Sequence, residues 1–103
     1  MYGLIGKMLC VSGKRAELAS ILLENAGGMP GCLSYVVSED ASDPDALWIT
    51  EVWDSKDSHA GSLRLPSVQD AISRGRSMIT GFGERFETTP LGGHGLVVTD
   101  NDE

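Results

Sequence analysis

The chain has 103 residues, a length that accommodates one domain with a single hydrophobic core. Eight Lys and Arg residues against fifteen Asp and Glu residues give a formal net charge of -7, which argues against binding to nucleic acid or to an anionic membrane surface. Hydrophobic residues make up 41% and charged residues 22% of the chain, the balance of an ordinary globular protein.

The N-terminal half of the sequence predicts a strand, a helix and a second strand. Residues 2–11 are apolar at both odd and even positions, which is typical of a strand covered on both faces. Residues 14–26 carry apolar side chains at helical spacing, and Gly27-Gly28 is expected to supply the positive φ that often ends a helix. Residues 32–38 alternate between apolar and polar side chains and predict a second strand.

The C-terminal half predicts two more strands with helices between them. After an acidic loop, residues 46–53 form a third predicted strand that is apolar on both faces. Ser55 begins a short helical segment, and Pro66 suits the first turn of a longer helix whose spacing continues to Ile79. Residues 82–88 alternate as a fourth strand.

This order of elements predicts an α+β fold, a ferredoxin-like β-α-β-β-α-β sandwich with two helices on one face of a four-stranded antiparallel sheet. The other face of the sheet would also be apolar, so we expect a homodimer that closes sheet on sheet. The first and second strands would run parallel with the third between them, which places Cys10 and Cys32 well beyond the ~7 Å limit for a disulfide.

Reduced thiols and the lack of a signal-peptide pattern predict a cytoplasmic protein. No apolar run approaches the ~20 residues of a membrane-spanning helix. We expect one domain over residues 1–95, followed by a C-terminal arm and acidic tail over residues 96–103. The Gly-rich segment around His94, with the apolar residues after it, is interpreted as an arm that lies on a partner subunit.

Several segments, in their order and spacing, resemble the antibiotic biosynthesis monooxygenase family over roughly residues 2–96. They are GCLSY at 31–35, WITEVWDS at 48–55 and HAGSL at 59–63, followed by a helix. Two later segments, FGERFET at 82–88 and GGHG at 92–95, are similar to a quinol monooxygenase-like subgroup of that family.

The resemblance implies small dimers of ferredoxin-like subunits whose sheets join into a barrel. It also implies oxidation of electron-rich aromatics, such as anthrones and quinols, by molecular oxygen with no cofactor, neither metal nor flavin. Related members degrade haem with an Asn, a Trp and a His. This chain has Ser62 where that Trp would stand and Ile72 near the place of the His, so haem degradation is not expected.

His59 is the candidate catalytic residue. Cofactor-free oxygenation requires removal of a substrate proton inside an apolar pocket that excludes water. An imidazole titrates near neutral pH, and this one follows the end of the third predicted strand. The alternative is a surface histidine that bonds solvent or a nearby carboxylate such as Asp57. His94 is interpreted as a dimer contact.

Five residues are candidates for substrate binding, each with a structural alternative: Trp53, Tyr35, Trp48, Met78 and Phe82. The two tryptophans differ by five positions and therefore point to opposite faces of one strand, where core packing is the commoner role. Tyr35 can bond a quinol oxygen or place its hydroxyl near water. Met78 and Phe82 can line an apolar cavity or simply fill a core.

Glu51 is unusual because it interrupts an apolar strand. A structural ion pair with Lys7 or Arg85 is favoured over an unpaired carboxylate that acts as a base. Three functions stay open: a cofactor-independent monooxygenase, a non-catalytic dimeric domain that binds a small molecule, and a domain whose only role is its dimer. A cavity beside His59 would favour the first, and a filled interior with His59 facing water would favour the third.

Overall fold

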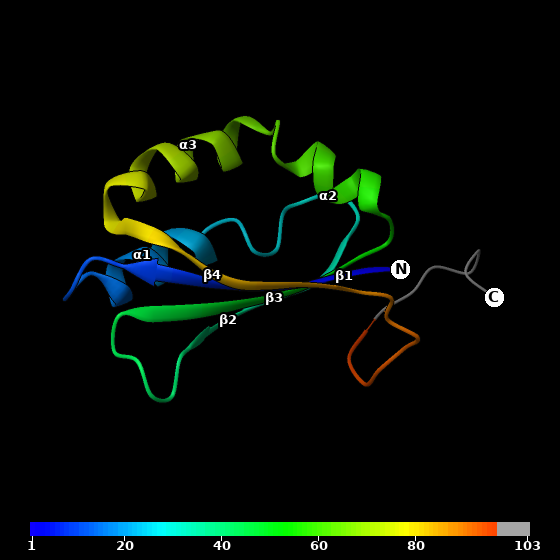
Figure 1. Cartoon of the computed structure of the whole chain (residues 1–103). Helices are drawn as coiled ribbons and strands as arrows, with labels where there is room; N and C mark the ends of the chain where they lie inside the picture. The colour runs from blue at the N-terminus through cyan, green and yellow to red at the C-terminus, as the bar shows by residue number, and fades with distance from the viewer. Residues whose placement is uncertain (97–103) are drawn as a thin grey trace.

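The computed structural model describes residues 1–96, and the predicted tail beyond residue 96 lies outside them. Figure 1 shows α2 and α3 arching over one face of a sheet. The elements in chain order are β1 (Tyr2–Cys10), α1 (Arg15–Leu23), β2 (Cys32–Glu39), β3 (Ala46–Trp53), α2 (Lys56–Ser62), α3 (Pro66–Gly75), the single 3₁₀ turn η1 (Arg76–Met78) and β4 (Ile79–Thr88).

The four strands lie in the order β2-β3-β1-β4, and every neighbouring pair is antiparallel. The predicted α+β ferredoxin-like fold is therefore confirmed. β1 and β2 both flank β3, so they run parallel to each other, and Cys10 and Cys32 are free thiols as the topology predicts.

Local sequence explains where the helices over the sheet begin. The Ser55 side chain accepts a hydrogen bond from the backbone N–H of Ser58 at 3.1 Å, which caps α2. Pro66 occupies the first turn of α3, where its missing N–H costs no hydrogen bond. No helix within residues 1–96 is long and apolar enough to cross a membrane.

Two predicted boundaries are wrong. The end of α1 has no glycine cap: the helix stops at Leu23, and neither Gly27 nor Gly28 has positive φ. The fourth strand begins at Ile79 rather than at residue 82, because α3 already ends at Gly75. Ile79 packs against the core, as an apolar residue would at the end of a helix or at the start of a strand. Helical spacing alone therefore cannot distinguish the last turn of a helix from the first residue of a strand.

The layer between sheet and helices is packed at one end. Under α1, a cluster of buried side chains, which we call the packed half, holds the helix on the sheet: Cys10, Leu18, Leu47 and Ile49. A second cluster at the other end of β1 consists of Tyr2, Leu4 and Trp53. The functional interest lies in the space between these two clusters.

The opposite face of the sheet has no helix over it within residues 1–96. Val36 and Phe86, whose positions alternate with those that face the helices, are about half exposed there. The sheet-on-sheet dimer stays a prediction.

Candidate functional site

A cavity of about 370 Å³, the main cavity, lies between the sheet and helices α2 and α3. Most of its lining is apolar, contributed by the sheet and by α1 and α3. The polar side chains on its wall are Asn25, Tyr35, Glu51, His59 and Ser62. An apolar hollow with a few convergent polar groups has the character of a small-molecule site.

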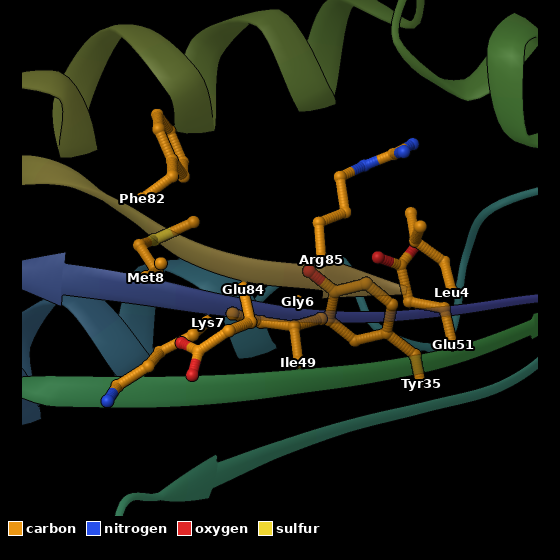
Figure 2. Close-up of a pocket in the computed structure, with 11 residues that line it drawn as sticks. Leu4, Gly6, Lys7, Met8, Tyr35, Ile49, Glu51, Phe82, Glu84 and Arg85 are labelled. Carbon is orange, nitrogen blue, oxygen red and sulfur yellow. The ribbon is translucent and has the colours of Figure 1, made fainter. Parts of the chain in front are cut away.

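A second space of about 260 Å³, the side hollow, adjoins the main cavity along β1 and β4. The two share four lining residues, Met8, Tyr35, Glu51 and Phe82. Figure 2 shows that Tyr35 from β2, Glu51 from β3 and Arg85 from β4 rise on the same side of the sheet, toward α3. The sheet therefore supplies a floor on which polar groups from three strands meet.

His59 lies in the middle of α2 and faces the sheet. Its Nε2 is 3.9 Å from Oε1 of Glu51, and the two side chains are only 17% and 13% exposed. The imidazole packs between two aromatic rings, with centroid distances of 5.6 Å to Tyr2 and 5.5 Å to Trp53. Tyr2 and Trp53 are paired in the β1–β3 register, so the strand pairing itself builds this slot.

Glu51 is the acidic partner in this group. The Trp53 indole Nε1 donates a hydrogen bond of 3.0 Å to Oε1 of Glu51. Burial raises the pKa of Glu51 above its usual value, against the opposing effects of the Trp53 hydrogen bond and of the nearby His59 and Arg85. A buried carboxyl group with a raised pKa that faces a histidine in a cavity is a candidate functional residue.

The predicted partnership of Glu51 with Lys7 is wrong. Lys7 extends toward the β2–β3 loop instead, where its Nζ lies 3.7 Å from Oδ2 of Asp40 and over the ring of Trp48. Arg85 forms no salt bridge with Glu51 among the residues described, although it is close enough to lower the pKa of Glu51.

Tyr35 brings a hydroxyl group to both spaces. Burial, followed by the negative charge of Glu51, raises the pKa of the Tyr35 phenol well above its ordinary value. The group therefore stays protonated at neutral pH and remains a hydrogen-bond donor. The ring extends inward from β2 and carries its hydroxyl over the floor of the site (Figure 2).

The structure brings some of the predicted site residues together and leaves others apart. His59, Tyr35 and Phe82 line the main cavity, and Phe82 is 71% exposed at its rim. Trp53 does not line the cavity but lies fully buried against His59 and Glu51.

Trp48 and Met78 lie away from the main cavity. Trp48 lies on the opposite face of the sheet from Glu51 and Trp53, because successive side chains of a strand alternate between the two faces. There its indole donates a hydrogen bond of 2.7 Å to Oδ2 of Asp40. Met78 packs against the core cluster and lines a separate groove with α1 residues. His94 is exposed in the segment after β4.

Two contributors to this site escape sequence reasoning. Tyr2 forms one wall of the histidine slot, and its hydroxyl donates a 2.6 Å hydrogen bond to Oε2 of Glu87, which also pairs with Lys56 at 3.4 Å. Gly6 lines the side hollow. A glycine inside a strand is the one signal that the sequence offers for such a place.

Within residues 1–96, no three His, Cys, Asp or Glu side chains come together in a way that could hold a metal ion. The described side chains of the site offer a carboxylate and imidazole pair, a protonated phenol and an apolar enclosure.

Comparisons with known proteins connect this geometry to a family. The sequence model described as antibiotic biosynthesis monooxygenase matches residues 1–74, which run from β1 almost to the end of α3. None of the curated proteins matches the chain.

Solved structures add three informative matches. A candidate antibiotic biosynthesis monooxygenase from Chloroflexus aurantiacus J-10-fl is 61% identical, with 93% of this chain and 98% of that chain covered and a TM-score of 0.89. One from Deinococcus radiodurans is 28% identical, with 96% and 99% covered and a TM-score of 0.73. One from Nitrosomonas europaea, 14% identical with 89% and 100% covered and a TM-score of 0.77, shares the fold.

Proposed function

The chain belongs to the antibiotic biosynthesis monooxygenase family, and from that premise we propose that its main cavity oxidises a small electron-rich aromatic, quinol-like or anthrone-like, with molecular oxygen and no bound cofactor. The observation that carries the proposal is the apolar cavity of about 370 Å³ with the His59–Glu51 pair on its wall.

Proton removal is the first task of such a site. In the proposed mechanism, the imidazole of His59 accepts a proton from the substrate, and the Glu51 carboxylate, 3.9 Å away, stabilises the imidazolium that forms. The Tyr35 hydroxyl donates a hydrogen bond to the substrate oxygen on which negative charge develops. The resulting anion is electron-rich enough to react with oxygen directly.

The overall change balances without an added reductant. For an anthrone, the reacting CH₂ carbon loses two hydrogens and gains one oxygen atom as a carbonyl. The second oxygen atom leaves as water together with those two hydrogens. The apolar lining of the cavity keeps bulk water from protonating the anion before oxygen arrives.

Oxygen uptake by the purified protein tests this proposal. We expect enzyme-dependent uptake with a panel of quinols and anthrones, and a fall of at least ~100-fold in His59→Ala, the scale of a lost general base. His94→Ala is the matched control, because it removes the other histidine from an exposed position away from the cavity.

The outcomes separate the candidate functions. Uptake that is unchanged in His59→Ala would remove His59 from the mechanism. If the panel compounds bind but no uptake exceeds the spontaneous rate, the non-catalytic ligand-binding alternative gains the support.

The sheet-on-sheet homodimer and the cytoplasmic location belong to the same proposal. The half-exposed Val36 and Phe86 on the sheet face opposite the helices support the dimer. Replacing Phe86 with Asp should then lower the molar mass measured by light scattering from that of a dimer to that of a monomer.

A further inference from the structure

The backbone conformation at position 6 does not require the glycine that occupies it. It lies within β1 and is not among the glycines with positive φ, so any L-residue could adopt its conformation. A Cβ atom built there would meet no atom within 4 Å. Gly3 on the same strand differs, because a side chain there would collide with Thr88 and Pro90. Gly6 therefore leaves space that the fold itself does not use.

That space is the side hollow. Its floor is apolar on the β1 and β3 sides of Gly6, with Leu4 and Met8 on the same strand and Ile49 on β3. On the other side lies Arg85 of β4, which is paired with Gly6 in the β1–β4 register and also lines the hollow. Figure 2 shows Gly6 between Met8 and Leu4, at the level where the Tyr35 ring crosses the sheet. The space open at Gly6 is thus part of a surface suited to a flat apolar group.

The two spaces differ in what they offer. His59 lines the main cavity but not the side hollow, and Gly6 lines the side hollow but not the main cavity. Tyr35 and Phe82 border both spaces. The shared residues place the two spaces side by side, so a molecule long enough to extend from His59 past Tyr35 would lie over Gly6.

We propose that Gly6 sets the length of the substrate: the reacting ring lies beside His59, and a second or third fused ring lies over Gly6. Among the quinol-like and anthrone-like substrates of the proposed function, Gly6 then favours the longer, fused-ring members over single-ring quinols. The inference rests on the proposed function for the chemistry of the reacting ring. Its claim about length can be tested by binding alone.

The test uses a size series at Gly6, made up of Gly6→Ala, Gly6→Val and Gly6→Leu. Two ligands are compared, anthraquinone with three fused rings and hydroquinone with one, and binding is followed by quenching of tryptophan fluorescence. Gly27→Leu is the matched control, because Gly27 has ordinary φ, has open space around its Cβ position and does not line either space.

The wild type should bind anthraquinone more tightly than hydroquinone. Gly6→Leu should weaken anthraquinone binding by about 10-fold or more, because its side chain would occupy the space of the distal ring. Hydroquinone affinity should stay within about two-fold, and the Gly6→Ala and Gly6→Val effects should fall in order of side-chain size. The Gly27→Leu control should match the wild type with both ligands.

Several results would overturn the inference. They are an equal loss for both ligands, no loss in any of the three Gly6 variants, or wild-type protein that does not prefer the three-ring ligand. The graded series keeps the test decisive if the leucine variant fails to fold. Size-dependent binding without any oxygen uptake would instead overturn the proposed function and leave the inference standing.

Discussion

The two halves of the layer between sheet and helices are built from the same strands and serve opposite purposes. In the packed half, Leu47 of β3 is fully buried and lines neither space, and Leu18 of α1, also fully buried, belongs to the same cluster and borders the main cavity. In the hollow half, defined by Tyr35, Glu51, His59 and Phe82, the strands carry polar or rim side chains and a cavity remains. The contrast teaches that the buried packing of this small domain is concentrated in clusters toward the two ends of β1, which leaves the space between them free to hold a ligand.

The sharpest test of this contrast compares one truncation in each half. Leu47→Ala should lower the free energy of unfolding by roughly 3 kcal/mol, since it removes a fully buried side chain that lines neither space and leaves a cavity. Phe82→Ala should cost less than about 1 kcal/mol, because Phe82 is mostly exposed at the cavity rim. Urea unfolding monitored by circular dichroism measures both.

Similar losses in the two variants would mean that the hollow half contributes as much to stability as the packed half. The dependence of the unfolding free energy on urea concentration should first be shown to be the same in both variants. A change in that slope would mean that the substitution altered the compactness of the unfolded state rather than the packing of the native state.

The second test replaces the carboxylate of the hollow half. Glu51→Gln keeps the shape of the side chain and an oxygen that can accept the Trp53 hydrogen bond. It removes the charge that stabilises the His59 imidazolium, so the rate of oxygen uptake should fall by roughly 10- to 100-fold. Steady-state kinetics should show the loss in kcat, with KM nearly unchanged. A normal kcat would show that the pairing of Glu51 and His59 does not serve catalysis.

The third and smallest effect concerns stability as a function of pH. Burial raises the pKa of Glu51 above its ordinary 4.5, so folding favours the protonated carboxyl. The stability linked to that proton is fully present below the ordinary pKa and is lost as the pH rises through the raised one. Glu51→Gln cannot lose it, so the stability of the variant relative to the wild type should be greater at pH 7 than at pH 4.

Thermal unfolding at pH 4 and pH 7 checks this prediction. The difference between variant and wild type should widen at the higher pH. A constant difference would contradict a raised pKa for Glu51. The exposed pair Glu24 and Arg74 offers a control of opposite sign: the hydrogen bonds from Arg74 lower the pKa of Glu24, so Glu24→Gln should lose stability relative to the wild type as the pH rises.

Sequence patterning predicted the fold well because the strands carry strong signals. Ala46–Trp53 was predicted with its observed ends, since a mostly apolar run, interrupted only at Thr50 and Glu51, is bounded by aspartates on both sides. The start of β4 was missed because Ile79 satisfies the period of a helix as well as that of a strand. The end of α1 was missed because paired glycines need not adopt positive φ when the chain continues through ordinary turns.

The candidate site was harder to predict from sequence. The alternation of side chains along β3 correctly places Trp48 and Trp53 on opposite faces of the sheet, but it does not say which of them lies beneath a helix. The approach of His59 to Glu51 depends on the angle at which α2 crosses the strands, and no spacing in the sequence encodes that angle. Sequence reasoning identified both residues and assigned Glu51 the wrong partner.

The strand order also determines when the site can exist during folding. β2 and β3 pair across a short loop, whereas β1 pairs with β4 through contacts such as Leu4 with Glu87, from opposite ends of the described chain. Closing so long a loop is slow, so Phe82 and Arg85 should reach the floor late. On the ribosome, β1 must wait with one hydrogen-bonding edge unpaired until β4 has been synthesised, and in that interval the nascent chain is most exposed to aggregation.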